Sequence, residues 1–189
     1  RDIFVQAWYQ GGISVIDFTD SANPVEIAYF DRGPILEDEL ITGGYWSAYY
    51  YEGAIYGTEI TRGLDVLKLL PSEYMSENEI SAAAMAYPVI GLRRFNPQQQ
   101  MPMTWPAVPE VAGAYIDQLL RDNAIAEDAA ERIGDMLDQV TQAMDNGGDN
   151  RLARQINSYR ISAKGSNIDE LTRHRLEKLN ATLKGIAAG

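Results

Sequence analysis

A stretch of this chain occurs twice, and the two copies constrain the fold more than any other feature. Residues 4–17 align without a gap on residues 55–68. Each copy is expected to form a strand, a short turn that ends in Gly12 or Gly63, and a second strand with alternating apolar residues. Glycine is favoured there because it lets the chain turn with a positive φ.

A repeat of about 50 residues built from short strands is typical of a β-propeller blade. Because a propeller needs at least about four blades, two copies cannot close a ring. The sequence therefore predicts a β + α protein, with the C-terminal blades of a β-propeller at 1–70. The chain starts at Arg1 rather than at Met, so we expect the remaining blades to come from upstream sequence or from a protein partner.

The second strand of each copy carries a family resemblance. The run Gly12-Ile-Ser-Val-Ile-Asp-Phe-Thr-Asp-Ser-Ala-Asn-Pro24 resembles the LVIVD repeat, and 63–71 resembles a second copy with Lys68 at the aspartate position. This resemblance implies propeller blades in a secreted, periplasmic or cell-surface protein. It implies no particular activity.

Two aspartates of the first copy are the candidates for a metal site. Asp17 and Asp20 are expected to accept hydrogen bonds from backbone amides of the turn that ends at Pro24. A calcium ion is the alternative ligand for the same carboxylates.

An aromatic cluster gives the candidates for an interaction surface. The residues proposed for this role are Tyr45, Trp46, Tyr49, Tyr51 and Trp105. Aromatic side chains suit a half-buried pleated surface, so packing between blades is the alternative for the cluster at 45–56. Trp105 lies in a segment that can pack on its own domain or dock on another subunit.

The character of the sequence changes at Pro71. Ser76 and Glu79 have the spacing of a capping box ahead of a helix. The range 71–109 is predicted to be a short helix followed by a proline-rich connector. Apolar stripes at helical spacing then predict four helices in a small antiparallel bundle at 110–189, the last of them capped at Asn167.

Composition excludes several kinds of site. The chain has no cysteine and a single histidine, His174, so thiolate and multi-histidine metal sites are excluded, and no G-x-S-x-G motif accompanies the histidine. The net charge of −11 disfavours binding along a nucleic-acid backbone. No apolar run reaches the ~20 residues of a membrane span.

These observations predict a non-enzymatic binding or scaffold module of an extracytoplasmic or cell-surface assembly, with no cofactor. Two alternatives stay open. The first is a hydrolase or lyase whose site lies at the mouth of a full propeller. The second is an accessory subunit of a cell-envelope complex that docks through its helical bundle.

Overall fold

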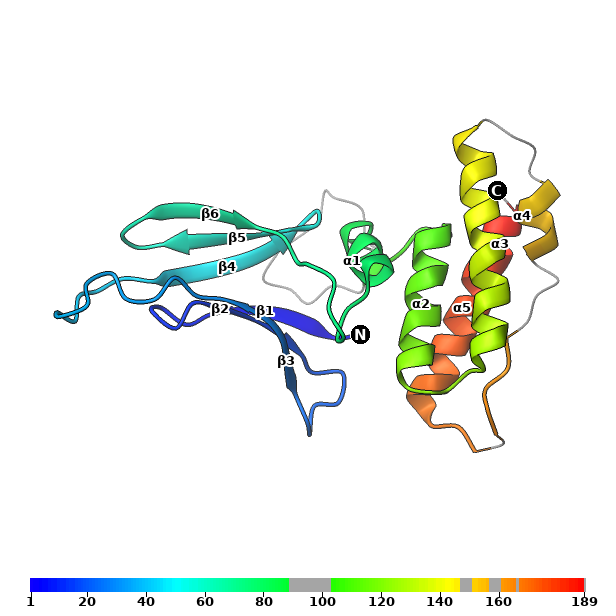
Figure 1. Cartoon of the computed structure of the whole chain (residues 1–189), viewed down its shortest axis with the longest axis horizontal. Helices are drawn as coiled ribbons and strands as arrows, with labels where there is room; N and C mark the ends of the chain where they lie inside the picture. Colours follow the sequence, from blue (N-terminus) through cyan, green and yellow to red (C-terminus); the bar gives the residue numbers. More distant parts are fainter. Residues whose placement is uncertain (89–102, 147–150, 157–160, 166, 189) are drawn as a thin grey trace. The chain divides into compact units, whose positions relative to one another are not determined.

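The computed structural model describes residues 1–88, 103–146, 151–156, 161–165 and 167–188. It divides into two compact units, Arg1–Met75 and Ser76–Gly189. We call them the sheet unit and the helical unit and describe each by itself (Figure 1).

The sheet unit contains two antiparallel sheets of three strands each, paired in chain order. The first sheet consists of β1 (Ile3–Ala7), β2 (Ile13–Asp17) and β3 (Val25–Phe30). The second consists of β4 (Tyr45–Tyr51), β5 (Ala54–Glu59) and β6 (Gly63–Leu67). The strands β1, β2, β5 and β6 lie where the repeated sequence predicts strands.

The two copies of the repeated sequence have the same strand pairing. Val5 pairs with Val15 in the first copy, and Tyr56 pairs with Val66 in the second, so β1 and β2 correspond to β5 and β6. Gly12 and Gly63 precede the second strand of each copy with φ of 81° and 97°. The segment is therefore repeated in the structure as well as in the amino-acid sequence.

The prediction of a β-propeller is wrong. The described residues form three small antiparallel sheets of two or three strands, none of which closes or takes part in a ring. One reason lies in the sequence after the second copy. A four-stranded propeller blade would need a further strand there. The side chain of Ser76 accepts from the backbone of Glu79, and Glu79 bonds back to Ser76. This capping box begins a helix instead of a strand.

The helical unit contains five helices and one two-stranded sheet among the residues described. The helices are α1 (Glu77–Ala84), α2 (Pro109–Arg121), α3 (Glu127–Asp145), α4 (Arg151–Ile156) and α5 (Glu170–Ala188). The sheet pairs β7 (Tyr87–Pro88) with β8 (Met103–Thr104). Much of the predicted connector, 89–102, lies outside the described residues.

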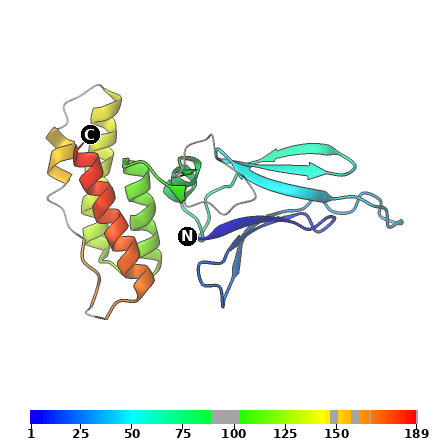
Figure 2. The same cartoon turned by 180° about the vertical axis from the view of Figure 1, so that it is seen from behind.

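The core of the helical unit lies around α2, which packs on α1, α3 and α5. Figures 1 and 2 show that α2 runs antiparallel to α3 and to α5. Leu119, Val140, Leu179 and Leu183 are among its fully buried side chains. The predicted cap of the last helix is wrong by two residues, because the carboxylate of Asp169, not Asn167, accepts from the backbone N–H of Thr172 at 2.6 Å.

Candidate functional site

A backbone bridge joins the two sheets of the sheet unit. The N–H of Tyr45 donates to the carbonyl of Tyr9 at 2.8 Å, and the N–H of Tyr9 donates to the carbonyl of Tyr45 at 3.1 Å. The ring of Tyr9 meets that of Trp46 edge-on, with centroids 5.8 Å apart. The bridge brings the end of β1 to the start of β4.

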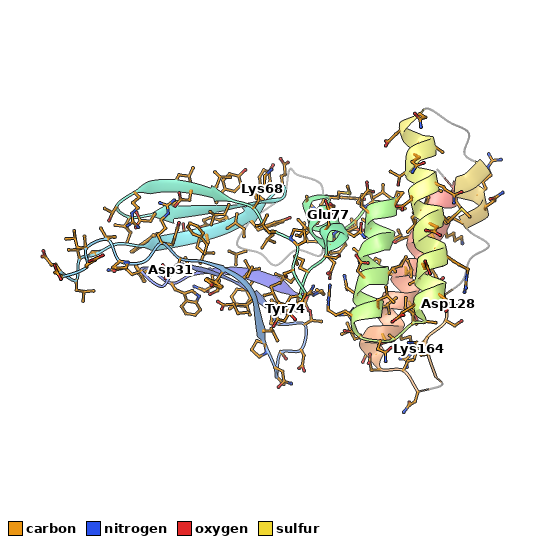
Figure 3. The ribbon with its side chains drawn as sticks, in the orientation of Figure 1. Asp31, Lys68, Tyr74, Glu77, Asp128 and Lys164 are labelled. Carbon is orange, nitrogen blue, oxygen red and sulfur yellow. The ribbon has the colours of Figure 1, made fainter. Side chains whose placement is uncertain are left out.

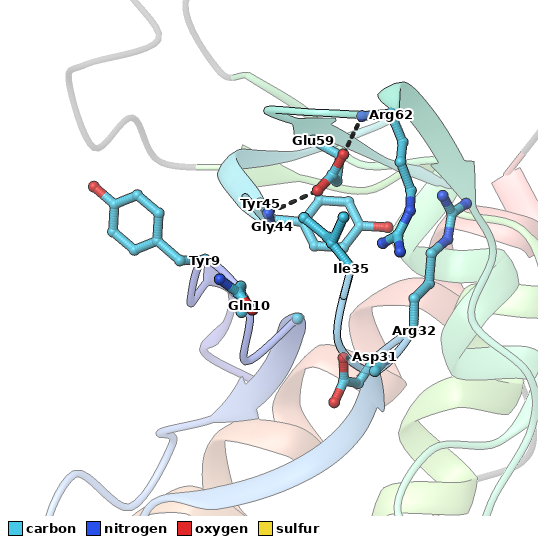
Figure 4. A pocket seen from close by; sticks show the side chains of 11 residues that line it. Tyr9, Gln10, Asp31, Arg32, Ile35, Gly44, Tyr45, Glu59 and Arg62 are labelled. Carbon is cyan, nitrogen blue, oxygen red and sulfur yellow. Dashed lines mark hydrogen bonds between the residues drawn. The ribbon is translucent and has the colours of Figure 1, made fainter. Parts of the chain in front are cut away.

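A buried carboxylate holds the turn beside this bridge. Glu59 accepts hydrogen bonds from the backbone N–H groups of Gly44, Thr61 and Arg62, at 2.7 Å from Gly44 and 2.9 Å from Thr61 (Figure 4). Burial opposes its ionisation, but the three N–H donors outweigh burial and lower the pKa of Glu59 below its ordinary value. Glu59 therefore acts as a structural anion.

Tyr45 lies inside the sheet unit with only 3 % of its surface exposed. Its hydroxyl donates to Asp65 at 2.6 Å, and Asp65 also pairs with Arg32. Burial raises the pKa of Tyr45 well above its ordinary value, and the Asp65 carboxylate raises it further. The hydroxyl thus remains a hydrogen-bond donor.

These groups surround a shallow hollow, shown in Figure 4, whose lining includes Asp31, Arg32 and Ile35. Its free volume is about 10 Å³, roughly the space of one water molecule. Ligand pockets usually enclose about 300–1,000 Å³. The hollow therefore supports the packing between β-strands and does not form a substrate pocket.

The second sheet has an outer face that turns away from the first sheet. Cross-strand pairing puts Tyr49, Tyr56 and Val66 side by side on it, with Leu64 beside Thr58. We call this surface, made of Tyr49, Tyr51, Tyr56, Leu64, Val66 and Lys68, the Leu64 face. Most of its side chains are well exposed, and Lys68 directly follows β6 (Figure 3).

The first sheet has an open face of its own. Pairing puts Phe4 beside Ile16 and Ser14 beside Tyr29, while Phe18 meets Phe4 with ring centroids 5.3 Å apart. We call this surface, made of Phe4, Gln6, Ser14, Ile16, Phe18, Glu26 and Tyr29, the Phe4 face; Ser14 is its buried member, whereas Phe4, Phe18, Glu26 and Tyr29 are exposed. Ser14 donates to Glu26 at 2.5 Å and accepts from the indole of Trp8 at 2.9 Å.

Most exposed large apolar side chains of the described residues belong to the sheet unit. They are Phe4, Trp8, Tyr9, Phe18, Val25, Tyr29, Leu36, Leu40, Trp46, Tyr49, Tyr50, Tyr51, Ile60, Leu64, Val66, Leu70 and Tyr74. An antiparallel sheet with one packed face usually has polar residues on the other. Contiguous exposed apolar surface instead marks an interaction site, so these faces are the candidate functional site.

The structure separates the predicted aromatic residues. Trp46, Tyr49 and Tyr51 are exposed, whereas Tyr45 is buried. The β4–β5 register shifts between Tyr45 and Ser47, and such a bulge turns the following side chains to the opposite face. Trp105 is partly exposed and lies just after β8 in the helical unit.

The two candidate metal-binding aspartates have protein partners. Asp17 accepts from the side chains of Arg1 and Thr19, at 2.7 and 2.6 Å. Asp20 accepts from the backbone of Ala22 and the side chain of Asn23. Over the part of the chain that is described, no three acidic or histidine side chains gather as they would to hold a metal ion.

His174 is exposed on α5. In the helical unit, sequence reasoning also missed an ion pair between a buried arginine and an exposed aspartate. Arg175 of α5 is 7 % exposed and pairs with Asp122, which follows α2.

Within the described ranges, no helix is long and apolar enough to cross a bilayer.

Comparisons with known proteins returned no likeness: no family model matches the sequence, and no curated protein or solved structure matches it. The resemblance to the LVIVD repeat therefore stays a prediction from the residues quoted above.

Proposed function

We propose that the sheet unit is a non-enzymatic binding or scaffold module that holds a protein surface against its open faces. The observation that carries this proposal is the apolar character of the Leu64 face and the Phe4 face, which lie on opposite sides of the same unit. An extracytoplasmic or cell-surface location belongs to the same proposal and rests on the LVIVD resemblance.

Energetics favour a protein partner over a small ligand. Burying a Leu, Val or aromatic side chain completely contributes about 1.5–3 kcal/mol. The Leu64 face offers Tyr49 on β4 and Leu64 and Val66 on β6, the two strands that flank β5, so a broad, flat partner can cover them together. A small ligand would cover one or two of them and would still leave apolar surface in water.

Site-specific photo-cross-linking tests the proposal in the cells that make the protein. A benzophenone amino acid replaces Tyr49 on the Leu64 face, or Leu40 in the loop that precedes β4. Both side chains are well exposed, so neither replacement should disturb folding.

We expect the probe at 49 to give a protein adduct heavier than the 21.0 kDa chain, and the probe at 40 to give none. Absence of an adduct from 49, and from a second probe at 64, would contradict a protein-binding role for this face.

A further inference from the structure

The partner of the Leu64 face can be inferred from a contact that the chain already makes with itself. Ile13 and Val15 of β2 are buried. The Cδ1 atom of Ile13 lies over Gly57 of β5, only 2.7 Å from where a Cβ of residue 57 would be. The first sheet thus stacks its Ile13 side on the inner face of the second sheet.

Within the sheet unit, all of whose residues the structure describes, the equivalent side of the second sheet has no such cover. Leu64 and Val66 occupy in β6 the positions that Ile13 and Val15 occupy in β2, with the same pairing to the preceding strand. Ile13 and Val15 are buried, whereas Leu64 and Val66 are both more than half exposed. The same apolar pattern is therefore buried in the first copy of the repeat and exposed in the second.

The surface that would cover it is also present in the chain. Ile55 and Gly57, on the inner face of the second sheet, correspond to Phe4 and Gln6 in the first. Phe4 belongs to the Phe4 face, which is open as well. The side-chain amide nitrogen of Gln6 donates to the carbonyl of its neighbour Ala7 at 2.8 Å, so this donor is satisfied locally.

We propose that a second copy of this chain lays its Phe4 face on the Leu64 face, which repeats between molecules the stacking that joins the two sheets within one. This inference rests on the proposed binding function. The contact is head-to-tail, so each molecule uses one face toward each neighbour. Gln6 takes the position of Gly57, so its side chain lies between the two sheets and they cannot approach as closely at that point as the two sheets within one molecule do.

Charge favours the same pairing. The Leu64 face carries Lys68 at the end of β6, two positions beyond Val66. The Phe4 face carries Glu26, paired across from Ile16, and has no basic residue among its members. Opposite signs on facing surfaces steer association and select the register. A contact of either face with itself would have no such pair of opposite charges.

Sedimentation velocity of the full chain, over a roughly hundredfold range of concentration, tests the proposal. We expect the average mass to rise with concentration beyond twice 21.0 kDa, because a head-to-tail contact leaves a free face at each end. A chain that stays monomeric at every concentration would overturn the proposal.

Three variants define the geometry, each at a well-exposed residue. Leu64→Glu disables one face and Tyr29→Glu the other, while Leu40→Glu in the loop is the matched control. We expect each face variant alone to be monomeric and the control to associate like the wild type. An equimolar mixture of the two face variants should form a dimer that grows no further, since each supplies the face that the other lacks.

A mixture that stays monomeric, or a face variant that still associates, would contradict head-to-tail stacking. Near-ultraviolet circular dichroism shows that each variant keeps its folded aromatic environment. The cross-linking experiment separates the two proposals. Adducts made only of this chain support both, whereas an adduct with a different protein, together with a monomeric purified chain, supports the binding function and overturns self-association.

Discussion

Ile13 and Leu64 occupy equivalent positions in two copies of one structural repeat, but Ile13 is 2 % exposed and Leu64 is 63 % exposed. Both are aliphatic, and they pair in the same register with the preceding strand, Ile13 with Ala7 and Leu64 with Thr58. The difference arises from what lies above each side chain. Ile13 meets Gly57 of the neighbouring sheet, whereas Leu64 belongs to an open face.

This relationship predicts that truncation to alanine lowers the free energy of unfolding more at Ile13 than at Leu64. Ile13→Ala should lower the free energy of unfolding of the sheet unit by about 2–5 kcal/mol, because it leaves a cavity in a packed contact. Leu64→Ala should change it by no more than about 0.5 kcal/mol in the monomer. Urea unfolding, followed by tryptophan fluorescence at low protein concentration, measures both values, and equal costs would contradict the assignment of buried and open faces.

Gly57 should tolerate no side chain. A Cβ there would lie 2.8 Å from the ring of Tyr45 as well as 2.7 Å from Ile13. Gly57→Ala should therefore destabilise the sheet unit by about 1–3 kcal/mol through overpacking. Gly134→Ala is the matched control in α3, where a Cβ would have no neighbour within 4 Å. The control should stabilise its helix by up to about 1 kcal/mol, so the two changes should have opposite signs in urea unfolding.

Local elements could be predicted from sequence because their signals act over a few residues. The strands of the repeat follow alternation, and the helix after Ser76 follows its capping box. The repeat was also visible, since Gly12 and Gly63 mark equivalent turns. The propeller was a wrong extrapolation, because a repeat specifies how neighbouring strands pair and does not show how many sheets stack.

The candidate site was harder to predict, because equivalent sequence patterns have different environments. Ile13 and Leu64 cannot be distinguished by alternation. Tyr45 and Tyr49 have the same parity along β4, which predicts one shared face, but the bulge between Tyr45 and Ser47 puts them on opposite faces. Arg175 lies within an apolar stripe of α5, where only the fold shows that Asp122 reaches it.

Glu59 should make the sheet unit less stable in acid. Its pKa is lowered in the folded state by three backbone donors. A lowered pKa means that its contribution to stability is fully present above the ordinary pKa of the unfolded chain, 4.5, and is lost as pH falls through the folded pKa. Other carboxylates, including that of Asp17, are shifted in the same direction, so the comparison must be made with a variant.

Glu59→Gln removes the titrating group and nearly preserves its shape. Between about pH 6 and pH 3, urea midpoints of the sheet unit should fall less steeply for the variant than for the wild type. Parallel curves would show that the Glu59 carboxylate does not take part in acid unfolding.

The pair of Arg175 and Asp122 should respond unequally to removal of its two members. Asp122→Ala leaves the guanidinium of Arg175 buried without its carboxylate, and we expect a loss of about 1–3 kcal/mol from the helical unit. Arg175→Leu should be close to neutral, because it removes the charge together with Nε, a buried atom to which the described residues offer no hydrogen-bond partner. Asp128→Ala, which breaks an exposed pair with Arg132 in α3, is the control and should cost only about 0.3–0.5 kcal/mol. Far-ultraviolet circular dichroism during urea unfolding measures all three, and a larger loss for Arg175→Leu than for Asp122→Ala would show that the arginine itself stabilises the bundle.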